Sequence, residues 1–160
     1  MKLRYFEELK PNELEDYYST NIEFEDRQIE IDLNFSNTSI AESRLLKVNV
    51  ILEKLPEFVG KLNGFIQDDF KNRNDVQEFL DFHLDEIAEE LVPLLLRADQ
   101  SLKKDEQLLS ILDLKRIGFY PDNDEIFTVS DFGLDEEISQ YVLVVNTTQD
   151  QELHYITMES

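Results

Sequence analysis

The first third of the chain alternates apolar and polar residues, which is the pattern of a half-buried β-strand. Two such runs follow closely on each other, residues 22–25 and residues 29–35. The polar positions on their outer side are acidic: Glu23, Glu25, Glu30 and Asp32. With Asp26 and Arg27 as the loop, Phe24 would face Ile29, and Glu23 would face Glu30 as a repulsive pair. The pattern predicts a β-hairpin with an apolar inner face and an acidic outer face.

Apolar residues in the middle of the chain recur at the helical period of three to four. We expect a first helix that begins with a capping box at Ser39, and a second that carries Pro56 in its first turn. A third helix is expected to begin at Asn74 and to kink or end at Pro93. A shorter fourth helix is expected over residues 102–112.

The last third changes back to the period of strands. Four strands are expected, over residues 114–120, 126–132, 141–146 and 153–158. Their short connections favour an antiparallel meander, and Tyr141–Val145, apolar on both sides, is expected to be central and covered on both faces. The predicted fold class is therefore α+β: a mainly antiparallel sheet, made of an N-terminal hairpin and a four-strand meander, with a layer of three to four helices. We expect one domain over residues 1–160.

The charge is strongly one-sided, with 36 acidic and 15 basic residues and a net charge of -21. Ten of the acids lie in residues 117–160, which contain no Lys or Arg. Such a polyanion would be repelled by nucleic acids and by anionic membranes, so neither is expected as a partner. A basic protein partner is compatible with this charge, and so is a role in solubility alone.

Cysteine is absent, and the charged start of the chain does not have the pattern of a signal peptide. The longest apolar run, near Leu94, is too short to span a bilayer, so we expect a cytoplasmic protein. No Gly-rich phosphate loop, nucleophile elbow or zinc-protease motif occurs, so no cofactor, metal or catalytic residue is expected.

Three groups of residues could nevertheless support chemistry. His83 and His154, the two histidines, match no metal-ligand spacing, which favours packing or surface hydrogen bonds. The segment Asp122–Glu125 lacks the glycine and glutamate of a calcium loop, and the preceding Pro121 favours a structural turn.

The third group is a crowded set of carboxylates, Asp131, Asp135, Glu136 and Glu137. Paired carboxylates perform acid–base catalysis only when burial separates their pKa values, and the nearby Gly133 favours a solvated or partner-binding loop. Arg116, the last basic residue, is expected to pair with Asp131 or Glu159 across the sheet.

Several segments resemble a family of small bacterial domains of unknown function. They are Arg116-Ile-Gly-Phe-Tyr-Pro-Asp122, Phe127–Phe132, Tyr141–Val145, the ending Met158-Glu-Ser160 and, near the start, Ile31–Phe35 with Asn37–Ile40. Some members of this family are thought to be immunity proteins that neutralise toxins of competing bacteria. The resemblance implies an immunity protein here, and it carries over no catalytic residue.

Charge and resemblance together favour an acidic, non-enzymatic binding protein that neutralises a basic, nuclease-like toxin. The candidate partner-binding residues are Glu23, Glu25, Glu30, Asp32, Asp122, Asp124, Asp131, Asp135, Glu136 and Glu137. Two alternatives stay open. One is an enzyme or metal-binding protein that uses carboxylates with His83 or His154. The other is a housekeeping oligomeric domain, with a homodimer through the apolar strand Tyr141–Val145.

Overall fold

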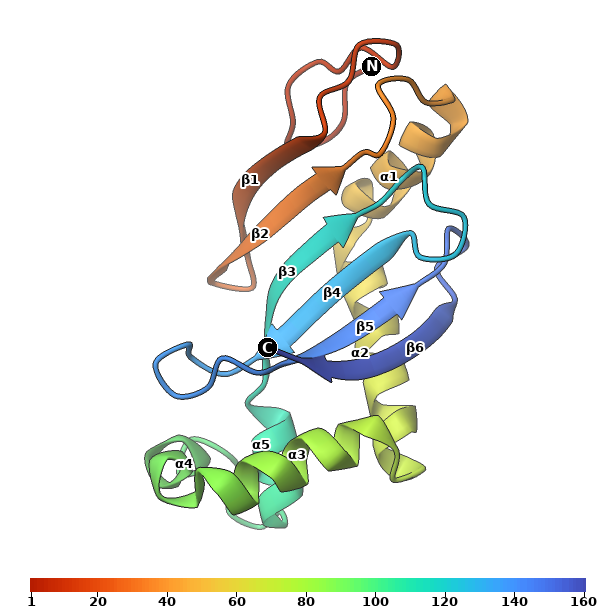
Figure 1. Ribbon diagram of the computed structural model, residues 1–160. Coiled ribbons are helices and arrows are strands. Elements are labelled where there is room, and N and C mark those ends of the chain that lie inside the picture. The colour runs from red at the N-terminus through yellow and green to blue at the C-terminus, as the bar shows by residue number, and fades with distance from the viewer.

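The protein is a six-stranded sheet with helices on one face, and the computed structural model describes all residues from 1 to 160 (Figure 1). The strands are β1 (Tyr17–Phe24), β2 (Arg27–Asn34), β3 (Asp113–Phe119), β4 (Thr128–Gly133), β5 (Val142–Thr147) and β6 (Leu153–Glu159). The helices are α1 (Glu42–Glu53), α2 (Leu55–Lys71), α3 (Asp75–Glu86), α4 (Ala88–Leu95) and α5 (Lys104–Ser110). The α+β class is therefore confirmed, with five helices where three to four were expected.

The strands lie in the sheet in their order along the chain, β1-β2-β3-β4-β5-β6. Every neighbouring pair is antiparallel except β2 and β3, which are parallel. All five helices come between these two strands, since a parallel connection must return the chain to the end from which it started. The expected mainly antiparallel sheet is confirmed, and the last four strands lie within two residues of their predicted positions.

The hairpin has a different register from the predicted one. Its turn is Glu25–Asp26, both with positive φ, and Ile22 pairs with Ile29 rather than with Ile31. Glu23 therefore lies opposite Gln28, and the expected repulsion between Glu23 and Glu30 does not occur. The register shift equals two residues on one strand, an even number, so every side chain stays on its predicted face.

Two helix boundaries also differ from the expectations. Ser39 does not cap α1, because the helix begins only at Glu42, with Ala41 at the N-cap position. The hydroxyl of Ser39 instead donates a hydrogen bond to Oδ1 of Asn12. The expected third helix is divided at Ile87, whose φ of -131° is not helical, into α3 and α4. Pro93 lies inside α4 and does not end it.

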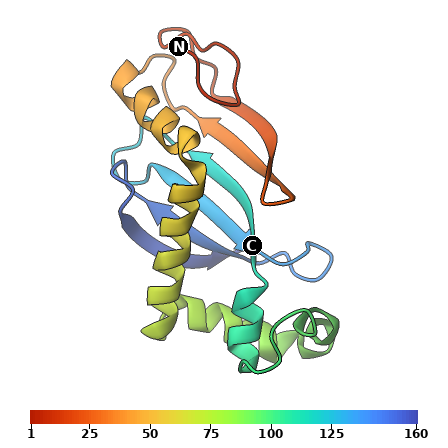
Figure 2. The ribbon, with the colours of Figure 1, turned by 180° about the vertical axis from the view of Figure 1, so that it is seen from behind.

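The core lies between the helices and one face of the sheet. Figure 2 shows α1 and α2 running along the sheet, and the buried residues of both helices belong to the same core as those of the strands. Alternate residues of the strands complete this core, among them Ile31, Ile117 and Val145, which are fully buried. No helix is both long and apolar enough to cross a membrane.

The opposite face of the sheet is not covered by any helix (Figure 1). Strand β5 is therefore covered by a layer on one face only, and the prediction of two covered faces is wrong. Leu143 and Val145 point into the core, whereas Val142 and Val144 lie on the open face. Val144 is nevertheless only 1% exposed, because neighbouring side chains of the open face surround it.

Candidate functional site

The open face gathers charged side chains from three adjacent strands. In the sheet register, Glu30 of β2 pairs with Arg116 of β3, and Arg116 pairs with Asp131 of β4. Asp32 lies beside Gly118 in the same way. Because side chains alternate between faces along a strand, all of these side chains lie on the same, open side of the sheet.

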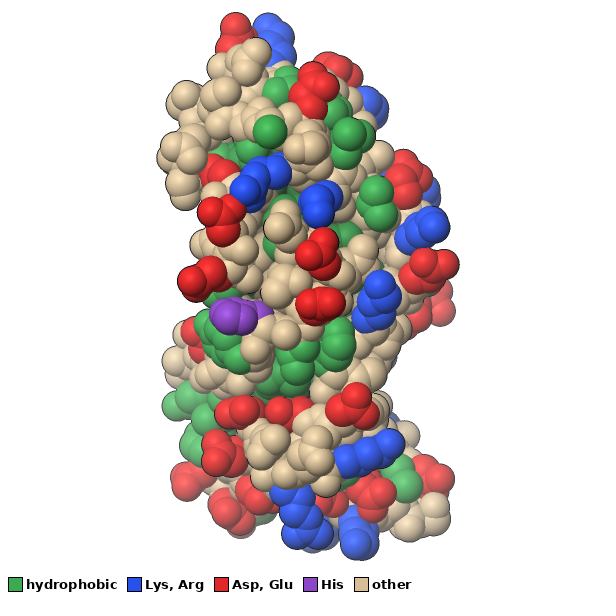
Figure 3. All heavy atoms as spheres, turned by 90° about the vertical axis from the view of Figure 1, so that its right-hand side faces the viewer, with side chains coloured by type: hydrophobic (Ala, Val, Ile, Leu, Met, Phe, Trp, Pro, Cys, Tyr) green, Lys and Arg blue, Asp and Glu red, His purple; other side chains and the backbone are tan.

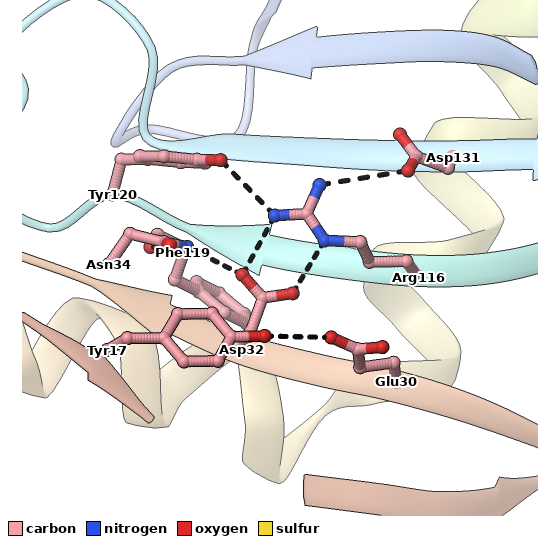
Figure 4. A network of polar contacts seen from close by, with 8 residues as sticks. All are labelled: Tyr17, Glu30, Asp32, Asn34, Arg116, Phe119, Tyr120 and Asp131. Atoms are coloured by element: carbon pink, nitrogen blue, oxygen red, sulfur yellow. Dashed lines mark hydrogen bonds and ion pairs between the residues drawn. The ribbon is translucent and has the colours of Figure 1, made fainter. Parts of the chain in front are cut away.

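The centre of this face is an ion pair between Arg116 and Asp32 (Figure 4). Nε of Arg116 lies 2.6 Å from Oδ2 of Asp32, and Nη2 lies 2.8 Å from Oδ1, so the contact is bidentate. Asp32 is fully buried, and Asn34 donates a further hydrogen bond to it. The hydrogen bonds to Asp32 raise the pKa of Arg116, and the pair holds β2 and β3 together.

Gly118 provides the space in which the guanidinium of Arg116 lies. A Cβ atom at this position would overlap Nη2 of Arg116 and would come within 3.1 Å of Oδ1 of Asp32. The hydroxyl of Tyr120 lies 3.2 Å from the same Nη2. Arg116, Gly118 and Tyr120 thus all contribute to one ion pair: Arg116 forms it, Gly118 leaves room for it and Tyr120 contacts its guanidinium. This is a structural reason for their spacing of two residues.

Asp131 is held much more loosely than Asp32. Its Oδ2 atom lies 3.7 Å from Nη1 of Arg116, too far for a hydrogen bond, and no other group of the protein donates to this carboxylate. Burial raises the pKa of Asp131, the negative charge of Glu159 raises it further, and Arg116 opposes the shift. Asp131 is therefore a half-buried carboxylate with unused acceptor capacity.

A second carboxylate at this site, Glu30, accepts a hydrogen bond from the hydroxyl of Tyr17 on β1, at 3.0 Å (Figure 4). This contact raises the pKa of Tyr17. It leaves one oxygen of Glu30 without a protein donor.

Two adjoining hollows lie on the open face. The larger, of about 620 Å³, runs over β3–β6 and is lined by charged, polar and apolar residues. The smaller, of about 470 Å³, lies beside Glu30 and the loop between β4 and β5. Arg116, Asp131, Gln140 and Val142 line both, so the two hollows form one groove, which we call the open-face groove.

One end of the molecule carries a concentration of exposed acids, which we call the acidic end. It consists of Asp81, Asp85, Glu86, Glu89, Glu90, Asp135, Glu136 and Glu137. The two contributing segments are joined by His83 of α3, whose Nε2 lies 2.7 Å from the hydroxyl of Ser139. Figures 1 and 2 both show α4 and the loop between β4 and β5 at this end.

The predicted partner-binding residues are divided by the fold into three groups. The first group lies toward the hairpin turn and the acidic end, and consists of Glu23, Glu25, Glu30, Asp131 and residues 135–137. Asp122 and Asp124 lie at the opposite end of the sheet, in the connection between β3 and β4 (Figure 1). Asp32 is buried beneath Arg116, so it adds no exposed charge.

Asp122 and Asp124 both have structural contacts. Oδ2 of Asp122 accepts hydrogen bonds from the backbone N–H groups of Ser36 and Asn37, at 2.8 and 3.0 Å. Asp124 pairs with Arg44 of α1 at 2.5 Å. The connection is a turn that fastens β3 and β4 to the segment after β2, as the proline and the short polar residues predict.

The histidines do not form a common site. His83 is fully buried, and its Nδ1 lies 2.8 Å from the carbonyl oxygen of Phe79. Because a carbonyl oxygen can only accept, Nδ1 is the donor in this contact. Burial lowers the pKa of His83, which favours the neutral imidazole, and in that form Nε2 accepts a hydrogen bond from Ser139. His154 is exposed beside Tyr155 on β6. No group of three or more His, Asp or Glu side chains is arranged to hold a metal ion.

Two features of the site were missed from the sequence. Arg116 forms the expected ion pair with Asp131, at 3.7 Å, but its main partner, Asp32, was not expected, because β2 and β3 are unexpected parallel neighbours. The acidic character of α3 and α4 was also missed, although residues 74–96 contain seven acids and no Lys or Arg. That signal was visible in the sequence.

Comparison of the chain with family models, with curated proteins and with solved structures finds no match. The resemblance to a family with immunity proteins among its members therefore stays a prediction, and the site is interpreted from its geometry.

Proposed function

We propose that this protein is a non-enzymatic binding protein whose acidic end docks on a basic surface of another protein. In the form that the resemblance favours, the partner is a bacterial toxin of the nuclease type, and the protein is its immunity protein. The observation that carries the proposal is the acidic end itself, where two segments joined by the contact of His83 with Ser139 carry eight exposed carboxylates.

The acidic end contrasts with the side of the molecule formed by α1, α2 and the turn between β5 and β6. Acidic and basic side chains are interspersed on that side (Figure 3). Arg44 pairs there with Asp124, and Lys47 pairs with Asp150 at 3.3 Å. Internal pairing thus compensates charge on one side, while no ion pair involves the residues of the acidic end.

A one-signed surface acts mainly on the rate of association. Its field attracts a cationic partner before contact, and it suppresses partners of like charge. A nuclease binds a polyanion through a cationic cleft, and exposed carboxylates fit such a cleft where phosphates otherwise lie. Occupying that cleft would block access of nucleic acid without any chemical step.

The test compares two variants with the same net charge. The triple variant Asp135→Asn/Glu136→Gln/Glu137→Gln removes three charges from the acidic end. The matched variant Glu57→Gln/Asp68→Asn/Glu152→Gln removes three exposed charges elsewhere, and both change the net charge from -21 to -18. Partners are captured from a lysate of the native cells at low salt, purified, and mixed with each protein in a stopped-flow instrument.

We expect the on-rate of the unaltered protein to fall at least about tenfold from about 20 to about 300 mM NaCl. The triple variant should associate several times more slowly than the matched variant. Co-expression should restore growth of cells that express the captured protein. An on-rate that is independent of salt, or equal for the two variants, would refute the acidic end as the docking surface.

A further inference from the structure

We propose that the open-face groove is a binding site for an arginine side chain of the protein partner, with Asp131 as the carboxylate that receives the guanidinium. This proposal rests on the proposed function, since it assigns a specific contact to a partner that the acidic end attracts. The groove adjoins the acidic end because Glu136, Ser139 and Gln140 of the loop between β4 and β5 line it.

The charge balance of the groove favours a cation. Its charged lining residues are Glu30, Lys115, Arg116, Asp131, Glu136 and Glu159. Arg116 is already neutralised by the bidentate contact with the buried Asp32. Four carboxylates then face a single uncompensated lysine, so the groove is complementary to a positively charged side chain.

Asp131 has the free acceptor capacity that such a side chain needs. It accepts no hydrogen bond from the protein, and its nearest cationic atom, Nη1 of Arg116, is 3.7 Å away. A guanidinium from outside would donate two parallel hydrogen bonds to a carboxylate of this kind. Its charge would also relieve the repulsion between Asp131 and Glu159 that raises the pKa of Asp131.

The remaining lining of the groove favours arginine over lysine. Val129 and Val142, both partly exposed, form an apolar strip beside Asp131, on which the methylene groups of a long side chain can pack. Tyr155, which is 44% exposed, stands at the edge of this strip. A planar guanidinium stacks on an aromatic ring, whereas the strongly hydrated ammonium group of lysine loses more solvation there.

A second copy of the chain is a poorer occupant of the groove. Two molecules that each carry a net charge of -21 repel one another, and the groove itself is negative. The occupant must therefore bring positive charge from a different protein.

The test uses two short peptides as probes, acetyl-Gly-Arg-Gly-amide and the same peptide with citrulline, which has the shape of arginine without its charge. The methyl signals of Val129, Val142 and Val144 are followed by NMR during titration of each peptide. We expect the arginine peptide to shift these signals in a saturable way and the citrulline peptide to leave them unchanged.

Asp131→Asn should weaken binding of the arginine peptide at least about tenfold, while the matched variant Asp68→Asn on α2 should bind like the unaltered protein. Thermal melts of both variants are the check that each is folded. Equal shifts with the two peptides, shifts confined to the acidic end, or unchanged binding by Asp131→Asn would each overturn the proposal.

The peptide titration and the salt dependence of the partner's on-rate together distinguish this proposal from the proposed function. If the captured partner still associates in a salt-dependent way but the arginine peptide leaves the valine signals unchanged, only the groove is refuted. If the peptide binds but the partner's on-rate does not respond to salt, the proposed function fails and the groove stands as a site for cationic side chains.

Discussion

At the scale of single residues, the decisive feature is an ion pair on the open face of the sheet in which the carboxylate is buried and the guanidinium is partly exposed. Asp32 has no exposed surface, and its carboxylate is satisfied by Arg116 and Asn34. Breaking such a pair leaves a buried charge without compensation, which costs more than the pair contributes. The residues that surround the pair, Gly118 above all, are therefore constrained by it.

Gly118→Ala should lower the free energy of unfolding by about 1–3 kcal/mol, because the new methyl group displaces the guanidinium of Arg116 from Asp32. Gly60→Ala is the matched control, since Gly60 lies within α2 and a Cβ there meets nothing within 4 Å. That control should raise the free energy of unfolding by about 0.5–1 kcal/mol, through helix propensity alone. The free energy of unfolding of both variants is measured by urea denaturation. Equal changes in the two variants would contradict the role given to Gly118.

At the scale of elements, a single buried histidine joins α3 to the loop between β4 and β5. His83 packs among Phe79, Phe82 and Tyr141, and both of its ring nitrogens have partners. Since the hydroxyl of Ser139 also accepts the N–H of Tyr141, one short network holds the helix against the sheet. This contact brings the two segments of the acidic end together.

Acid should loosen this connection, because burial lowers the pKa of His83 in the folded state. Its contribution to stability is present above the unfolded pKa of about 6.5 and is lost as the pH falls toward the lower folded value. The free energy of unfolding should therefore decrease as the pH falls below about 6.5. The measurement is the difference between the unaltered protein and His83→Gln in urea melts at each pH, since the carboxylates contribute equally to both. Identical pH dependences would mean that the pKa of His83 is the same in the folded and unfolded states.

At the scale of the whole molecule, the net charge of -21 dominates. Most of the 36 acids lie at the surface, and the ion pairs involve few of them. Exposed ion pairs contribute little each, so repulsion among the unpaired carboxylates is the larger effect.

Salt should therefore stabilise the protein. We expect the melting temperature to rise by several degrees between about 20 and about 500 mM NaCl, because screening reduces the repulsion more than it weakens the exposed pairs. The melting temperature is measured by differential scanning calorimetry. Sucrose at the same osmolality as the salt is the control for solvent effects. A melting temperature that falls with salt would show that attractive pairs outweigh repulsion.

The sequence by itself determined the local features of this protein. Alternation in β1 and β2 and the strand period of the last third predicted the strands and their inward faces, because a side chain's face depends only on its position along its own strand. The helical period did the same for α2, including Pro56 in its first turn. The charge imbalance and the cation-free segments were likewise readable from the residues alone.

Only the tertiary structure decided which distant residues meet. The register of the hairpin, the parallel contact of β2 with β3 and the break at Ile87 depend on how whole elements fit together. Asp32 and Arg116 are 84 residues apart in the chain, and no local pattern distinguishes Asp32 from the exposed acids beside it. The open-face groove and the acidic end arise in the same way, since packing in three dimensions selects among contacts that the linear order leaves equivalent.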